Sequence, residues 1–159
     1  MAGLRLSIVT AERALLSEEP VDFVSAPGSK GRLGILPQHT PLLTTLEPGD
    51  LYYRRGGEEV HIAVSGGFLE VDRDRVTVLA DTAERAEEII EARAEEARRR
   101  AEELLRQKER LSREELLRAE ASLRKAIVRL KVARWRRRVG EPLPGVEKGR
   151  EAGPAGDRQ

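Results

Sequence analysis

Histidine is the residue of this chain best suited to acid–base chemistry or metal binding, and the chain has two histidines and no cysteine. His39 stands between two prolines in the run PQHTP, and His61 alternates with apolar residues in EVHIAV. A general base needs a nucleophile or acid beside it, and zinc sites combine several His and Cys ligands. We therefore predict no catalytic residue and no metal site. His39 is interpreted as a loop residue that makes a structural hydrogen bond or a partner contact, and His61 as a strand-face residue.

Two further stretches contain residue types that bind phosphate. Gly66 and Gly67 precede Phe68, but the patterns GxxxxGK[ST] and GxGxxG are absent, so a nucleotide-hydrolysing loop is not supported. Residues 134–138 read RWRRR, in which Trp135 could stack on a nucleic-acid base among cations. The simpler interpretation, which we favour, is the end of a helix whose cations complement the helix dipole.

The composition differs between the parts of the chain that must hold these residues. Charged residues make up 36% of the 159 residues and aromatics 3%, which indicates a small core joined to a charged, extended element. Residues 1–82 carry 8 basic and 12 acidic side chains, whereas residues 83–138 carry 18 and 12. The second part should therefore seek acidic surfaces. No secretory signal or membrane-spanning run is recognised, so we expect a soluble, cytosolic protein.

Up to Asp81 the apolar residues recur with a period of two, interrupted by turn residues. Leu4, Leu6 and Ile8 alternate with polar residues, and the pair Gly56-Gly57 between two alternating runs is a strong hairpin signal. The pattern predicts about eight to ten short antiparallel strands, and hence a β sandwich or barrel over residues 1–82.

From residue 83 the period changes to that of a helix. The apolar stripe of the first helix is mostly alanine, which lets a partner helix approach closely, and consists of Ala86, Ile90, Ala94, Ala97, Ala101 and Leu104. Ser112 and Glu115 form a capping box that begins a second helix. The sequence therefore predicts an antiparallel helical hairpin over residues 83–138, joined by a linker near residues 81–84. The Gly- and Pro-rich tail, residues 139–159, is predicted to be disordered.

Three segments resemble one known family. GRLGILPQHTPLLTTLEPGDL, AVSGGFLEV and RAEASLRKAIVRLKVA are similar, in this order, to the epsilon subunit of bacterial F-type ATP synthases, and the resemblance covers about residues 3–135. It implies a non-catalytic subunit of the rotary central stalk, on the cytoplasmic side of the membrane, that helps to couple proton translocation to ATP synthesis. The sandwich would contact the gamma subunit and the c-ring. The hairpin would permit ATP hydrolysis when folded and inhibit it when extended towards the alpha and beta subunits.

The resemblance also implies roles for individual residues. The expected subunit interface is Leu36, Pro37, His39, Thr40, Pro41 and Leu42. The expected contacts of the inhibitory arm are Arg118, Arg124, Lys125, Arg129, Lys131 and Arg134. No cofactor is required, but some family members bind ATP in the folded hairpin, and the matching positions here are Ile89, Arg93, Ala94, Lys125 and Arg129. Ile90 replaces the acidic residue of that pattern, so ATP is expected to be at most a weak regulatory ligand.

Two other hypotheses are compatible with the residues taken alone. One is a nucleic-acid-binding module that uses residues 134–138, and the other is a stand-alone adapter with a coiled-coil arm. The resemblance favours the stalk subunit, which would bind no nucleic acid and would reach the membrane only through its complex.

Overall fold

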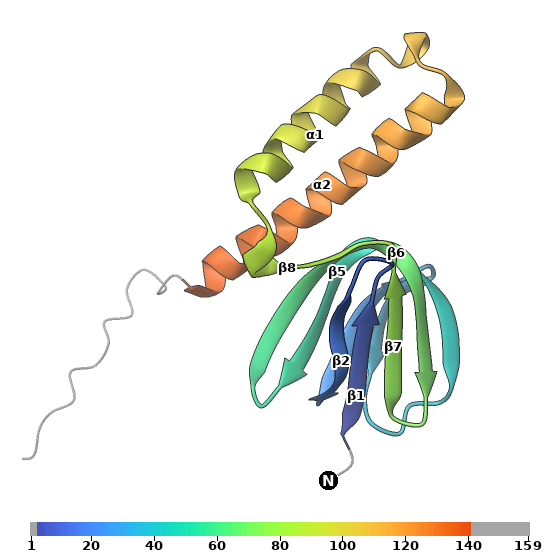
Figure 1. Ribbon diagram of the computed structural model, residues 1–159, viewed down its shortest axis with the longest axis vertical. Coiled ribbons are helices and arrows are strands. Elements are labelled where there is room, and N and C mark those ends of the chain that lie inside the picture. Colours follow the sequence, from blue (N-terminus) through green and yellow to red (C-terminus); the bar gives the residue numbers. More distant parts are fainter. Residues whose placement is uncertain (1–2, 141–159) are drawn as a thin grey trace, which may run out of the picture.

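The computed structural model describes residues 3–140 of the chain. A folded β-sheet forms one end of the molecule, and two helices project from it as a hairpin (Figure 1). The strands are β1 (Leu4–Val9), β2 (Ala14–Val21), β3 (Phe23–Gly28), β4 (Gly31–Ile35), β5 (Leu42–Arg55), β6 (Glu58–Asp72), β7 (Arg75–Ala80) and β8 (Ala83–Arg85). The helices are α1 (Glu91–Arg106) and α2 (Arg113–Gly140), with short 3₁₀ turns at Ala86–Glu88 and Lys108–Arg110. The predicted sandwich and helical hairpin are confirmed.

The strands form one sheet in the order β2-β1-β7-β6-β5-β3-β4, and β8 pairs with the first half of β6. The sheet folds over a core to which β1 contributes Leu4, Leu6 and Ile8, all of them fully buried. The described residues contain eight strands, within the predicted range, and β5 and β6 are long and continuous. One detail of the prediction was wrong: β1 pairs with β7 in parallel, which a period of two cannot reveal because it reports burial and not direction.

Strand β6 changes partners at a pair of glycines, so it pairs with β8 through residues 62–64 and with β7 through residues 67–72. Gly66 and Gly67 both have positive φ angles, of 107° and 126°. A Cβ atom at position 67 would lie only 2.0 Å from the carbonyl oxygen of Leu79. Gly67 is therefore required by the close approach of β6 and β7, and Gly66 is favoured by its positive φ angle.

The helical part begins later in the chain than the sequence predicts. Ala83–Arg85 continues the sheet as β8, and α1 starts only at Glu91. The predicted stripe is correct for Ala94 and Ala101, which are buried, but Ile90 and Leu104 are each 49% exposed. Ile90 lies before the first turn of α1, where the helical period does not yet apply.

The start of α2 confirms the predicted capping box. The backbone N–H of Glu115 donates to Oγ of Ser112 at 3.1 Å, and the backbone N–H of Ser112 donates to Oε2 of Glu115 at 2.8 Å. Helix α2 extends to Gly140, two residues into the segment predicted as a tail. The rest of that predicted tail, residues 141–159, lies outside the described residues.

Candidate interaction sites on the sandwich and the hairpin

Helix α2 lies between α1 and the sandwich, where it contacts β5 and β6 (Figure 1). A small apolar cluster joins the three parts, with Ala63 from β6, Ala94 from α1 and Val132 from α2 among its buried members. Several of the cluster's members are alanines, which remove little apolar surface from water. The hairpin is therefore docked on the sandwich by a modest apolar contact, and polar contacts contribute much of the remaining attachment.

Three ion pairs surround this junction. Arg129 donates to both carboxylate oxygens of Glu84 at 2.7 and 3.1 Å, and both side chains are mostly buried. Arg134 of α2 reaches Glu91 at 3.3 Å and Glu95 of α1 at 3.7 Å. Because Glu84 belongs to β8, the first pair ties α2 directly to the sheet.

The segment between β8 and α1 is held by a further pair. Both guanidinium nitrogens of Arg13 donate to the carboxylate of Glu88, at 2.9 and 2.7 Å. The hydrogen bond from Arg13 is the main reason why the pKa of Glu88 is lowered, and it outweighs the opposing effect of burial. Arg13 also donates to the carbonyl oxygen of Ala83 at 3.2 Å. The loop between β1 and β2 thus holds the segment that follows β8, where the sheet ends.

The most densely connected polar group of the junction is His61, which is only 4% exposed. Its ring stacks on Trp135 of α2, with centroids 3.6 Å apart, and on Tyr52 of β5, with centroids 4.9 Å apart. Nδ1 lies 2.8 Å from both carboxylate oxygens of Asp50, and Nε2 lies 2.7 Å from Oε1 of Glu59. We call these five residues the His61 cluster. The interpretation of His61 as a strand-face residue holds for the backbone but misses this buried contact with α2.

Two neighbours of Glu59 favour its charged form. Burial would raise the pKa of Glu59, but hydrogen bonds from His61 and Arg54 more than offset it, and the pKa is lowered. Arg54 donates to Glu59 at 2.9 Å from the solvent side.

Sequence reasoning missed the cluster because Trp135 is remote from His61 along the chain. With one face of Trp135 on His61, the tryptophan is not a free stacking platform, which weakens the nucleic-acid hypothesis. The side chains of residues 137–138 lie outside the described part of the chain.

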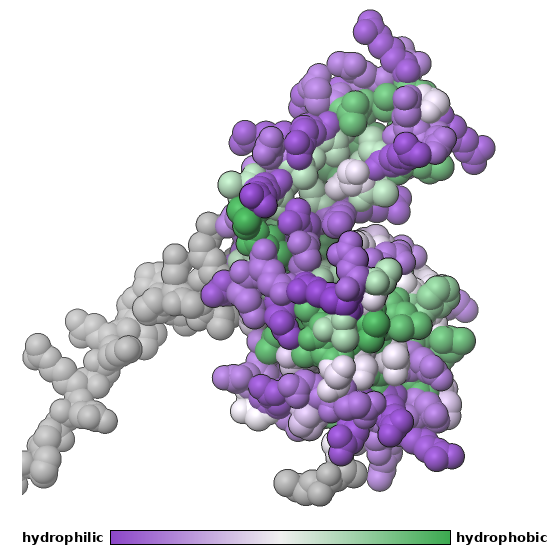
Figure 2. Space-filling view, in the orientation of Figure 1, coloured by the Kyte–Doolittle hydropathy of each residue, from purple (hydrophilic) through white to green (hydrophobic). Residues whose placement is uncertain are grey.

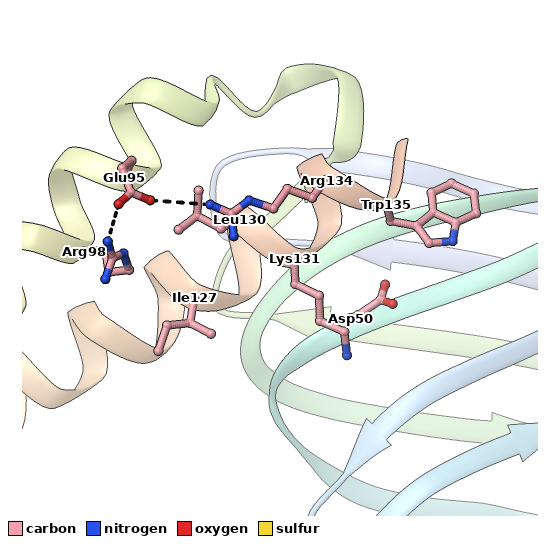
Figure 3. A pocket seen from close by; sticks show the side chains of 8 residues that line it. All are labelled: Asp50, Glu95, Arg98, Ile127, Leu130, Lys131, Arg134 and Trp135. Carbon is pink, nitrogen blue, oxygen red and sulfur yellow. Dashed lines mark hydrogen bonds and ion pairs between the residues drawn. The ribbon is translucent and has the colours of Figure 1, made fainter. Parts of the chain in front are cut away.

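A cavity of about 510 Å³ opens beside this cluster, between the hairpin and β5 (Figure 3). Its lining residues are Asp50, Glu95, Arg98, Ile127, Leu130, Lys131, Arg134 and Trp135. None of the five residues expected to bind ATP lines it. Ile89 and Ala94 are buried in the apolar cluster, Arg93 is exposed, and Arg129 is paired with Glu84. Lys125 lines a separate, smaller cavity with Arg124 and Asp81. The structure therefore does not gather the expected ATP residues around one cavity.

The remaining residues expected in the inhibitory arm lie along α2. Arg118 and Arg124 are exposed, and Arg118 forms an ion pair with Glu114 of the preceding turn. Lys131 lines the larger cavity, close to Asp50 in Figure 3. The set is thus divided in this conformation between solvent-facing cations and cations that hold the hairpin to itself or to the sheet.

The loop expected to form a subunit interface is tied to the turn between β6 and β7. The backbone N–H of Gln38 donates to Asp74 at 2.7 Å, and Nδ1 of His39 donates to the carbonyl oxygen of Thr40 at 2.6 Å. The latter is the structural hydrogen bond expected of His39. Within the expected set, Leu36, Thr40 and Pro41 are exposed, Pro37 and His39 are half-buried, and Leu42 packs against the core.

An apolar patch lies on the strands that continue from this loop. Its members are Leu43 on β5, Phe68 on β6 and Leu79 on β7, which are 72%, 54% and 53% exposed. Phe68 and Leu79 are directly opposed across the β6–β7 ladder, and Thr45 beside Leu43 opposes Phe68. Figure 2 shows apolar side chains gathered on one side of the sandwich. We call these three residues the apolar patch. The period-two pattern could not indicate it, because both faces of these strands carry apolar residues.

Residues 3–140 lack two further classes of site. No group of three or more His, Asp or Glu side chains able to hold a metal ion occurs there. In the same part of the chain, neither helix combines the length and apolar character needed to cross a membrane.

Comparisons with known proteins agree with the two-part architecture. Residues 3–86 match the family model for the ATP synthase delta/epsilon chain β-sandwich domain, and residues 87–134 match that for the long α-helix domain of the same chain. The two models meet after β8, four residues beyond the predicted boundary.

Individual relatives are similar over nearly their whole length. An ATP synthase epsilon chain from Herpetosiphon aurantiacus is 60% identical over 134 residues, which cover 84% of this chain and 96% of the relative. One from Chloroflexus aurantiacus is 64% identical over 130 residues, or 82% and 91% of the two chains. A chain in the mitochondrial ATP synthase of Euglena gracilis has the same fold, with a TM-score of 0.72, 24% identity and coverage of 84% and 82%. The resemblance seen in the sequence is confirmed: this chain belongs to the delta/epsilon chain family of ATP synthases.

Proposed function

We propose that this chain is a non-catalytic subunit of the central stalk of a bacterial F-type ATP synthase, on the cytoplasmic side of the membrane. It takes part in coupling proton translocation to ATP synthesis, and its hairpin regulates ATP hydrolysis. The observation that carries the proposal is the match of both domains, over residues 3–134, to the two family models. Relatives at about 60% identity that are named ATP synthase epsilon chain support it.

The sandwich is the part of the chain that assembles with the gamma subunit and the c-ring. The apolar patch supports this assignment, because three large apolar side chains exposed side by side on neighbouring strands are typical of an interaction surface. The loop that precedes the patch contributes Leu36, and its hydrogen bond to Asp74 keeps it in one conformation. A loop held in place loses less conformational entropy on docking than a free one.

The hairpin is the regulatory part. Its attachment to the sandwich consists of a small apolar cluster, the Arg129–Glu84 ion pair and the stack of Trp135 on His61, so the folded and extended arrangements can differ by only a few kcal/mol, as a switch requires. In the extended arrangement, the exposed cations of α2 bind acidic surfaces of the alpha and beta subunits. Strand β8 remains on the sheet and forms the base from which the hairpin departs.

The test is the ATPase activity of the assembled enzyme with the full chain and with a chain that ends at residue 86. We expect both forms to assemble and the shortened form to hydrolyse ATP faster. Phe68→Asp should weaken assembly, whereas Ile127→Asp, which places the same charge at an equally exposed apolar position of the hairpin, should not. Equal hydrolysis by the two forms would exclude a regulatory hairpin, and normal assembly of Phe68→Asp would exclude the apolar patch as a contact surface.

A further inference from the structure

The His61 cluster contains more hydrogen-bond acceptors than a neutral imidazole has donors. A neutral imidazole has one N–H donor and one lone pair, whereas an imidazolium has two donors. Both ring nitrogens of His61 lie within 2.7–2.8 Å of carboxylate oxygens, from Asp50 on one side and Glu59 on the other. A carboxylate offers only acceptors, so a neutral ring would point its lone pair at one of them. With both carboxyl groups ionised, the geometry is satisfied only when both nitrogens carry a proton.

One face of the His61 ring is covered by helix α2. Trp135 of α2 stacks on His61 at a centroid distance of 3.6 Å, while Tyr52 covers the opposite face. A cation over an indole ring is attracted by the electrons of the ring face, and the attraction is larger where water is excluded. The contact between α2 and the sheet at this point is therefore stronger with the charged ring than with the neutral one.

Other charged groups around the ring do not replace its proton. Arg54 lies on the outer side of Glu59, and Arg32 donates to the backbone oxygen of Asp50 rather than to its carboxylate. From α2, Lys131 lines the cavity beside Asp50, and Arg134 lines the same cavity but pairs with Glu91 and Glu95. A neutral His61 can donate to only one of the two carboxylates, Asp50 and Glu59, that lie on either side of it.

We propose that the His61 cluster is a proton-dependent latch that holds the hairpin on the sandwich while His61 is protonated and releases the end of α2 when it is neutral. The charged ring donates to both carboxylates and the neutral ring to only one, so the contact is stronger in the protonated form. Despite burial, hydrogen bonds from His61 and Arg54 lower the pKa of Glu59, and the bond from Arg54 does not depend on the proton of His61. The regulatory consequence rests on the proposed function: an acidified interior keeps the hairpin folded, and an alkaline one frees it for inhibition.

The latch can be tested on the isolated full chain, so that the result does not depend on assembly with other subunits. Trp135 is the sole tryptophan, and its fluorescence therefore reports on this contact alone. The chain has no cysteine, so cysteines introduced at Leu117 of α2 and Glu58 of β6 carry spin labels without competing sites. Both signals are followed from about pH 5 to about pH 9, the range in which histidine titrates and lysine and tyrosine do not.

We expect the Trp135 emission maximum to shift towards that of an exposed indole as the pH rises, together with growth of a longer inter-label distance. His61→Gln should abolish both changes. If His61→Gln fails to fold, Trp135→Leu decides, because it leaves the sheet intact and should show the longer distance at every pH. A constant short distance in the parent chain over the whole range would overturn the proposal. So would a pH response of the same size in His61→Gln or Trp135→Leu. An ATPase result that excluded regulation by the hairpin would leave the latch itself standing.

Discussion

Gly67 is a position at which the sheet leaves no room for a side chain. Its φ of 126° is rarely available to residues with a side chain, and the space for a Cβ atom is filled by the backbone of Leu79. Gly57, in the β5–β6 turn, also has a positive φ, of 85°, but nothing lies within 4 Å of its missing Cβ. Substitution of Gly57 therefore measures the cost of backbone conformation alone. Substitution of Gly67 measures that cost together with the cost of atomic overlap.

We predict that Gly57→Ala lowers the free energy of unfolding by about 1–2 kcal/mol, the cost of placing a side chain at positive φ. Gly67→Ala should lower it by a further 1–3 kcal/mol or more, because backbone atoms have to move as in an overpacked core. Urea denaturation of both variants at neutral pH measures the difference. Equal losses for the two variants would show that β6 and β7 separate easily.

The Glu88–Arg13 pair gives a prediction about pH. The pKa of Glu88 is lowered from its ordinary value of 4.5 by the hydrogen bond from Arg13, so the pair stabilises the fold above about that pH and stops doing so as the pH falls through the lowered value. Because both side chains are partly exposed, Glu88→Gln should cost no more than about 1 kcal/mol at neutral pH. The loss should vanish in acid. Glu87→Gln, at the exposed neighbouring position, is the control, and a loss of equal size at every pH would show that the charge of Glu88 is not responsible.

At the scale of the elements, the start of α1 is unusual. Ile90 is the N-cap residue and its side chain makes no capping hydrogen bond, although Asp or Asn at this position accepts one from the helix backbone. The same position carries an acidic residue in the ATP-binding pattern of the family. Ile90→Asp therefore tests both helix capping and ATP recognition, and a second variant that caps the helix without a carboxylate separates the two effects.

We expect Ile90→Asp and Ile90→Asn each to raise the free energy of unfolding by about 1 kcal/mol through capping. We also propose that ATP is at most a weak ligand of the unmodified hairpin and that only Ile90→Asp strengthens its binding, which titration calorimetry measures. Equal ATP affinity for the two variants would mean that the carboxylate has no role in recognition. Tight binding by the unmodified chain would show that another group replaces it.

The elements that could be predicted are those whose signals are local. Ser112 and Glu115 are three residues apart, and their capping box is present as expected. The alanines at positions 94 and 101 follow the helical period and are buried. β8 was missed because Ala83–Arg85 is short and leads into a helical pattern, so its strand character comes from pairing with β6. The stack of Trp135 on His61 joins distant parts of the chain, and no pattern in either segment indicates it.

For the whole molecule, the distribution of charge determines what the hairpin does. The sandwich segment is acidic and the hairpin is basic, so the cations of α2 can pair with either the sheet or a partner. Arg129 is already used by Glu84, whereas Arg118 and Arg124 are exposed and Lys125 borders the smaller cavity. These last three cations are therefore available to an acidic surface without loss of the folded attachment.

We predict that replacing Arg118, Arg124 and Lys125 with Gln relieves the inhibition of ATP hydrolysis in the assembled enzyme and makes it less sensitive to salt, which screens the same charges. The control removes three cations from α1 instead, at Arg99, Arg100 and Arg106. Hydrolysis rates measured at low and high ionic strength compare the two variants. If both behave alike, net charge matters and the position of the cations on α2 does not.

The parallel pairing of β1 with β7 also has a consequence for how the chain folds as it leaves the ribosome. Residue 5 pairs with residue 75, so the first strand to be synthesised cannot complete its ladder until nearly the whole sandwich has emerged. Until then, the β1–β2 hairpin has an open edge able to pair with another chain. Contacts so distant in the sequence raise the contact order and slow folding. The β1 edge is therefore exposed to pairing with other chains during synthesis until β7 docks between β1 and β6.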